Sequence, residues 1–101
     1  MIDTITKEEL VIRIENGAPM ALFDVRSKDE YDQRHIPNAI HLPLEELEKI
    51  VRYLNCNTLY VTVCGKGGGR SEEGAGIISE MGLKSASLVG GTFGWFETET
   101  E

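Results

Sequence analysis

Residues 61–71 read Val61-Thr62-Val63-Cys64-Gly65-Lys66-Gly67-Gly68-Gly69-Arg70-Ser71, and the rest of the chain is organised around them. A short β-branched run ends on a cysteine, and four of the next five residues are glycine. Glycine permits positive φ and close backbone approach, so such a loop can aim several amide groups at one anion. Ser71 is of a type that caps helices, and a helix beginning there would add the positive end of its dipole. The stretch therefore predicts a strand, a loop and a helix, with Cys64 at the base of the loop.

The chemistry expected of this loop follows from its charges and its thiol. A lone cysteine at a strand end is often a small buried hydrophobe, but here the glycines, two cations and a helix start coincide. Such surroundings favour the thiolate, so we expect Cys64 to be a nucleophile stabilised by the amides of residues 65–70. Lys66 would draw anions to the mouth or be a solvated charge. Arg70 would bind an anionic donor bidentately or brace the loop by pairing with an acidic group.

Composition limits the class of protein. A chain of 101 residues suits one compact domain, expected to span residues 1–101. The formal charge of -7 argues against nucleic-acid binding. No apolar run approaches a membrane span, and the N-terminus is too acidic and polar for a signal peptide. Two cysteines, Cys56 and Cys64, leave room for one disulfide but are too few for a secreted disulfide scaffold. We therefore expect a reducing, cytoplasmic setting.

Neither a metal nor a cofactor is expected. The two cysteines lack metal-ligand spacing, and the glycines lack the acidic residue that a dinucleotide site carries about 20 positions further on.

Helix and strand signals alternate along the chain. Helices are predicted at 6–16, 27–34, 43–54, 71–81 and 90–95, and strands at 21–25, 39–42, 59–63 and 85–89. Gly74 and Gly76 inside a helix predict close packing there. The inward-facing helical residues are expected to include Leu10, Val11, Ile14, Ala75, Ile77, Ile78 and Met81. Alternation favours a parallel sheet covered by helices on both faces. Active sites in such folds lie at the carboxyl ends of strands, which is where Cys64 stands.

Four motifs in order resemble the rhodanese-like domain over nearly the whole chain. Asp24-Val25-Arg26 is similar to the first signature of that family. Glu30-Tyr31 and the run His35-Ile36-Pro37-Asn38-Ala39-Ile40-His41-Leu42-Pro43 resemble the second. Val63-Cys64 with the glycine loop and Arg70-Ser71 resembles the active-site loop, and Leu88-Val89-Gly90-Gly91-Thr92-Phe93-Gly94-Trp95 resembles the closing motif. The resemblance implies a three-layer α/β fold with a mainly parallel central sheet and helices on both faces.

The same resemblance implies a sulfurtransferase. Cys64 would take a sulfane sulfur from a small anion such as thiosulfate or from a persulfide donor, become a persulfide, and pass the sulfur on. The acceptor would be a thiol, cyanide or an acceptor protein, with no nucleic acid or membrane involved. The loop residues would be Gly65, Lys66, Gly67, Gly68, Gly69 and Arg70. Asp24, Arg26 and Ser71 would support the loop, while His35 and His41 would serve the turn and its packing.

Two departures from the family keep alternatives open. Arg34 and Asn38 stand where the family often has glycine, and asparagine tolerates the positive φ that the turn needs. The spacing Cys-x5-Arg is one residue longer than the common sulfurtransferase loop and resembles the phosphatases and arsenate reductases of this fold. Those enzymes usually carry histidine before the cysteine, where this chain has Val63, and no aspartate is obviously placed as a general acid. A non-catalytic binding module of the same fold is a third alternative.

Overall fold

A central parallel sheet organises the molecule. The computed structural model describes residues 3–97, and within them the sheet has five strands in the order β1-β5-β4-β2-β3. The strands are β1 (Thr4–Ile5), β2 (Met20–Asp24), β3 (Ile40–His41), β4 (Leu59–Val63) and β5 (Ser85–Leu88). Strand β4 lies in the middle, and its register with β2 sets Val63 beside Asp24. The carboxyl ends of β2 and β4 therefore meet just where Cys64 begins the glycine loop.

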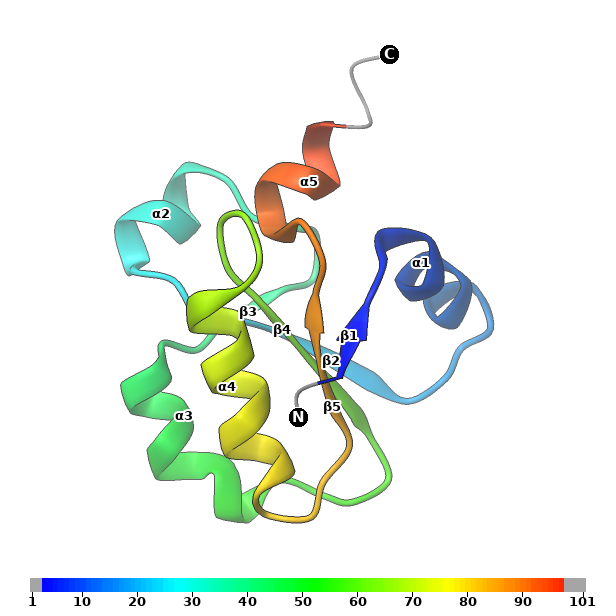
Figure 1. Ribbon diagram of the computed structural model, residues 1–101, viewed down its shortest axis with the longest axis vertical. Helices are drawn as coiled ribbons and strands as arrows, with labels where there is room; N and C mark the ends of the chain where they lie inside the picture. The colour runs from blue at the N-terminus through cyan, green and yellow to red at the C-terminus, as the bar shows by residue number, and fades with distance from the viewer. Residues whose placement is uncertain (1–2, 98–101) are drawn as a thin grey trace.

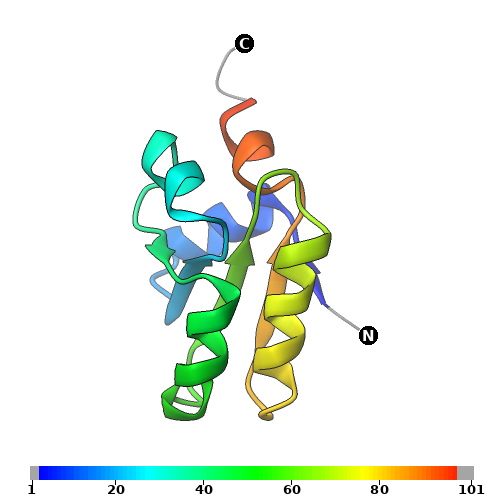
Figure 2. The ribbon, with the colours of Figure 1, turned by 90° about the vertical axis from the view of Figure 1, so that its left-hand side faces the viewer.

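Helices form the outer layers. They are α1 (Lys7–Glu15), α2 (Lys28–Gln33), α3 (Leu44–Ile50), α4 (Gly69–Ser79) and α5 (Gly91–Glu97), with a 3-10 turn η1 (Val51–Tyr53) after α3. Helices α3 and α4 cover one face of the sheet and α1 lies on the other, as Figures 1 and 2 show. Helices α2 and α5 stand beyond the carboxyl ends of the strands. The expected three-layer α/β arrangement with a parallel sheet is confirmed.

Each face of the sheet has its own apolar core. The core on the α1 side contains Ile5, Leu10, Leu22, Ile36, Ala39, Val61, Val63, Ala86 and Leu88. The core on the side of α3 and α4 contains Phe23, Val25, Leu47, Val51, Tyr60, Cys64 and Ile78. Alternate residues of β4 thus enter opposite cores, and burial on both faces explains why the strand carries no charged side chain. Cys64 continues this alternation on the α4 side, which directs its thiol under the following helix.

The structure corrects several predicted boundaries. Strand β1 was not predicted, since two residues give no periodicity to detect. The helix expected at 43–54 ends at Ile50 and continues only as the 3-10 turn η1. Helix α4 begins at Gly69 with Gly68 at its N-cap, so Ser71 is not the cap that the sequence predicted. Gly68 has φ +81 and ψ -146, a conformation open to glycine alone, and it turns the chain into the helix two residues early.

The helical residues that were predicted to face inward are buried near the centre of each helix but exposed near its end. Leu10, Ala75 and Ile78 are fully buried. Gly74 packs closely as expected, because a Cβ there would lie 3.2 Å from Cγ2 of Thr62. Ile14, predicted to face inward, is exposed. Met81, also predicted inward, is exposed because α4 ends at Ser79.

Candidate active site

The glycine loop closes around the sulfur of Cys64. This residue follows β4 directly and is only 4% exposed. Its Sγ lies 3.7 Å from the carbonyl oxygen of Gly68, four residues further along the loop. The loop rises between α2 and α5 at the carboxyl end of the sheet (Figure 1). Sequence reasoning therefore placed Cys64 and its loop correctly, at the base of a strand–loop–helix turn.

Two glycines of the loop have backbones that other residues would not adopt easily. Gly67 and Gly68 have φ of +87° and +81°. A Cβ on Gly67 would also lie 2.9 Å from the backbone nitrogen of Gly90. The early start of α4 leaves its first amide groups without intrahelical partners at the loop. The backbone of the loop therefore passes very close to that of Gly90. The N–H groups of the first turn of α4 are available at the loop.

Helix α5 supports the other side of the loop. The backbone N–H of Thr92 donates to the carbonyl of Cys64 at 2.8 Å, and that of Phe93 donates to the carbonyl of Gly65 at 2.9 Å. A side chain on Gly91 would collide with the carbonyl oxygens of Cys64 and Gly65. The glycines of the closing motif are visible in the sequence, but no local signal indicates that the amides of Thr92 and Phe93 donate to the loop. The ring of Phe93 is exposed and lies beside Gly65.

Ser71 ties the loop to the sheet. Its Oγ donates to the carbonyl of Gly68 at 2.9 Å and lies 2.6 Å from Oγ of Ser87 on β5. The hydroxyl of Thr62 on β4 donates to the Ser71 carbonyl at 2.6 Å. All three side chains are buried. Ser71 therefore links the base of the loop to strands β4 and β5.

Asp24 and Arg26 form a buried ion pair next to the site. Nε of Arg26 donates to Oδ1 of Asp24 at 2.9 Å, and Nη2 donates to Oδ2 at 2.8 Å. Nη2 also donates to the carbonyl of Arg34 at 2.6 Å. Both residues are at most 2% exposed. The pair joins the end of β2 to the segment after α2, and neither side chain is free to act as an acid or a base.

Arg70 braces the loop against α2. Its Nη1 donates to Oε1 of Glu30 at 2.8 Å, and its Nη2 donates to Oε2 at 3.1 Å. Glu30 also accepts from the backbone N–H of Ser27, because both belong to the capping box of α2. The Arg70 hydrogen bonds and the Ser27 amide lower the pKa of Glu30 to about 2. The hydrogen bonds that Arg70 donates to Glu30 in turn raise the pKa of Arg70 above its ordinary value.

Of the two roles expected for Arg70, the structure shows the pairing with an acidic group, which is Glu30. In the sequence, Glu30 stands out only as part of the second rhodanese-like motif. Its contact with Arg70 spans 40 positions, and no local signal predicts it. Lys66 is exposed at the loop and, among residues 3–97, makes no ion pair.

The two histidines lie in packing contacts. The ring of Tyr31 stacks on His35 with centroids 3.7 Å apart and on His41 at 4.9 Å. Nε2 of His41 lies 2.8 Å from the carbonyl oxygen of Arg26. Asn38 has φ +72, as expected for the turn. Cys56 is exposed and Cys64 is buried, and both thiols are free.

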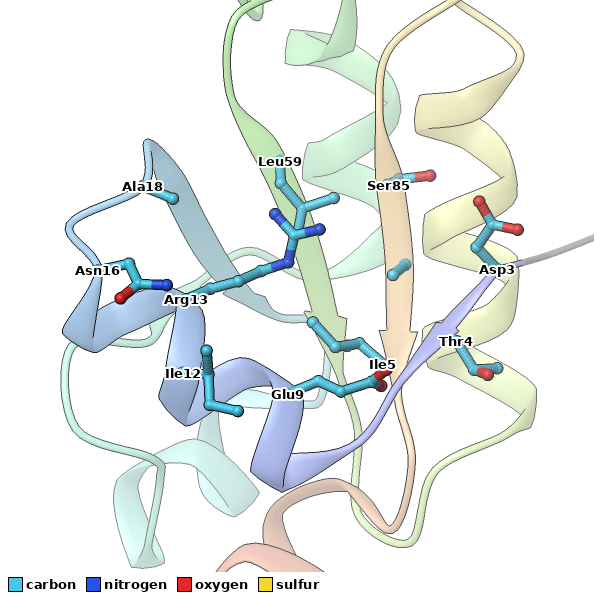
Figure 3. Close-up of a pocket in the computed structure, with 11 residues that line it drawn as sticks. Asp3, Thr4, Ile5, Glu9, Ile12, Arg13, Asn16, Ala18, Leu59 and Ser85 are labelled. Carbon is cyan, nitrogen blue, oxygen red and sulfur yellow. The ribbon is translucent and has the colours of Figure 1, made fainter.

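One hollow on the surface lies away from Cys64. A cavity of about 790 Å³ separates the last turn of α1 from strands β1, β4 and β5. Figure 3 shows the Arg13 side chain reaching across it toward Leu59. Leu59 is the first residue of β4, at the opposite end of the strand from Cys64.

Two further features limit the kinds of site that residues 3–97 contain. No group of three or more His, Cys, Asp or Glu side chains is arranged to hold a metal ion. None of the helices there has the length and apolar character needed to cross a bilayer.

Comparison with known proteins gives one family. The model of the rhodanese-like domain matches residues 6–98. The chain is 33% identical over 95 residues to YrkF of Bacillus subtilis, a candidate sulfur carrier protein, covering 93% of this chain and 51% of that one. It is 30% identical over 100 residues to YtwF of the same organism, a candidate sulfurtransferase, covering 99% and 95%. The chain thus spans about half of one relative and nearly all of the other.

A solved structure agrees with the sequence comparison. The crystal structure of the thiosulfate sulfurtransferase of Pseudomonas aeruginosa superposes with a TM-score of 0.86 at 27% identity, covering 99% of this chain and 20% of that one. The family model, the relative aligned along almost its full length and the shared fold lead to the same assignment: the chain belongs to the rhodanese-like domain family.

Proposed function

We propose that the protein is a sulfurtransferase that carries a sulfane sulfur as a persulfide on Cys64. The observation that carries the proposal is the placement of Sγ inside a closed loop of glycines at the end of β4. The family and the names of the relatives support sulfur transfer as the general activity. The free thiols of Cys56 and Cys64 suit the reducing, cytoplasmic setting that we propose for it.

The reaction has two displacement steps. The Cys64 thiolate attacks the outer sulfur of the donor, the sulfur–sulfur bond of the donor breaks, and the leaving group departs with the bonding pair. With thiosulfate the leaving group is sulfite, and the enzyme keeps a persulfide. A thiol, cyanide or an acceptor protein then attacks the outer sulfur, and the Cys64 thiolate leaves. The amides at the start of α4 stabilise the negative charge in both states.

The orientation of Arg70 favours sulfur over a tetrahedral oxyanion. Phosphatase-type chemistry on this loop needs the arginine to hold the oxyanion bidentately, but both terminal nitrogens of Arg70 donate to Glu30. It also needs a general acid for the leaving group, and the nearby Asp24 is paired with Arg26 in the core. These contacts support the sulfurtransferase over the phosphatase or arsenate reductase, although the Cys-x5-Arg spacing suits the latter.

Intact mass after incubation with thiosulfate tests the proposal. We expect a sulfur adduct of about 32 Da on Cys64, the mass added by persulfidation. Cys64→Ser should remove the adduct and Cys56→Ser should retain it. An adduct on Cys56 would contradict the assignment of the site, and no adduct with either thiosulfate or a persulfide would leave the oxyanion enzyme and the non-catalytic binding module.

A comparison of rates distinguishes a sulfurtransferase from a phosphatase or arsenate reductase. Thiosulfate-to-cyanide transfer and aryl-phosphate hydrolysis are measured side by side, each with the Cys64→Ser variant. Hydrolysis that depends on Cys64, without detectable sulfur transfer, would make the protein an oxyanion enzyme.

A further inference from the structure

The carboxylate of Glu30 takes the position on Arg70 that an anionic substrate would take. Two carboxylate oxygens face the two terminal nitrogens of the guanidinium at 2.8 and 3.1 Å. Tetrahedral oxyanions bind arginine through the same pair of nitrogens. Any oxyanion that used Arg70 would have to displace Glu30 or bind beside its negative charge.

Glu30 is held in place independently of Arg70. Its Oε1 accepts hydrogen bonds from the backbone N–H and the Oγ of Ser27, at 3.1 and 3.0 Å. These contacts belong to the capping box that begins α2. The carboxylate is therefore held by Ser27 as well as by Arg70. It competes with an anionic substrate for the guanidinium of Arg70.

The consequence differs between the two classes of sulfane donor. Thiosulfate is a tetrahedral dianion, and its affinity depends on cations at the mouth of the loop. A small persulfide presents its outer sulfur on a neutral or singly charged –S–SH group and has no tetrahedral oxyanion for Arg70 to hold. A fixed carboxylate that occupies Arg70 therefore disfavours thiosulfate, phosphate and arsenate more than it disfavours a persulfide.

We propose that Glu30 is a positioning residue for donor specificity, which acts by occupying Arg70, and that the donor of this sulfurtransferase is a persulfide rather than thiosulfate. This inference rests on the proposed function and narrows its substrate class. It also explains how a loop with the Cys-x5-Arg spacing avoids acting as an oxyanion site.

The test compares wild type with Glu30→Gln, which keeps an oxygen for the capping box and removes the charge. For each protein, kcat and KM are measured with thiosulfate and with cysteine persulfide, using the same acceptor. We expect the ratio of kcat/KM for thiosulfate to that for the persulfide to rise about tenfold in Glu30→Gln, mainly through a lower KM for thiosulfate, since one charge a few ångströms away acts on a dianion. Wild type should prefer the persulfide.

Binding without turnover gives an independent measurement. Inorganic phosphate should bind Glu30→Gln about tenfold more tightly than wild type by calorimetry, and adding Arg70→Met to Glu30→Gln should remove the gain. Glu80→Gln is the matched control, because Glu80 follows the last turn of α4, about 15 Å along the helix from Arg70. Glu80→Gln also removes one negative charge, and it should change neither the ratio of kcat/KM between the two donors nor the affinity for phosphate. Glu30→Asp, which retains the charge on a shorter arm, should give an intermediate gain and serves if Glu30→Gln folds poorly.

Two results would overturn the inference. One is a folded Glu30→Gln variant with unchanged donor ratio and phosphate affinity. The other is a gain that persists in the double variant, which would show that Arg70 is not the group released. If neither donor charges Cys64, the proposed function fails, while the phosphate measurement still reports on Glu30 separately.

Discussion

The buried Asp24–Arg26 pair illustrates how single residues near the site serve structure. In the interior, the guanidinium of Arg26 donates two hydrogen bonds to the carboxylate of Asp24 and a third to the carbonyl of Arg34. Removal of one partner leaves a charge without its counter-ion in a low dielectric, which is far more destabilising than the loss of a surface pair.

Arg26→Met should therefore lower the free energy of unfolding by about 3–5 kcal/mol, because it leaves the Asp24 carboxylate buried without its guanidinium. Arg52→Met is the comparison: Arg52 is exposed and lies over the ring of Tyr53, and its loss should cost less than about 1 kcal/mol. Urea unfolding measures both. Equal losses in the two variants would show that the buried pair contributes nothing special.

At the scale of elements, the close approach of α5 to the glycine loop determines where Cys64 sits. Gly91 begins this helix with φ +57, and the space for a side chain is filled by carbonyl oxygens of the loop. The neighbouring amides of Thr92 and Phe93 depend on that approach for their hydrogen bonds to the loop.

Gly91→Ala should thus both strain the backbone and push α5 away from the loop. Gly82→Ala provides the matched control, because Gly82 has φ +81 with nothing within 4 Å of its absent Cβ. The control should lose about 1–2 kcal/mol from backbone strain alone. Gly91→Ala should lose more, and alkylation of Cys64 by iodoacetamide should change only in this variant. If the two alanine variants match in both measurements, the loop does not depend on α5.

At the scale of the whole molecule, the contact between Glu30 and Arg70 fastens α2 to the start of α4. It joins segments that leave two different strands, β2 and β4, beyond the carboxyl end of the sheet. Since the Arg70 hydrogen bonds are the first cause of the lowered Glu30 pKa, the contribution of this contact to stability depends on pH.

The sign follows from proton linkage. The pKa of Glu30 falls from 4.5 to about 2 on folding, so the stabilisation is complete above the unfolded value and is lost as pH falls from about 4.5 toward about 2. The pair is partly exposed, which limits its contribution to about 1 kcal/mol or less.

Glu30→Gln should therefore be less stable than wild type near neutral pH by this small amount, and the difference should narrow as pH falls below about 4.5. Thermal unfolding of both proteins across the acid range measures it, and high salt at neutral pH should reduce the same difference. A difference that stays constant down to the lowest pH at which both proteins fold would mean that the contact does not stabilise the fold.

The sequence by itself determined the fold and the place of the thiol. Alternating helix and strand signals predicted the parallel sheet, and the β-branched run before Cys64 predicted its position at a strand end. The glycine run allowed for positive φ, which Gly67 and Gly68 adopt, and Asn38 was expected to tolerate it in its turn. These features depend on the backbone conformations that each residue allows and on the periodicity of apolar residues along the chain. Residues close together in the sequence are enough to specify both.

The tertiary structure alone decided how the loop is held and what Arg70 contacts. Sequence reasoning left Arg70 between a substrate ligand and a brace, and placed Ser71 at a helix cap. The structure pairs Arg70 with Glu30 and Ser71 with Ser87, and lets α5 donate to the carbonyl of Cys64. Each partner is distant in the chain, so the contact depends on strand order and on the register of β2, β4 and β5, which no local propensity encodes.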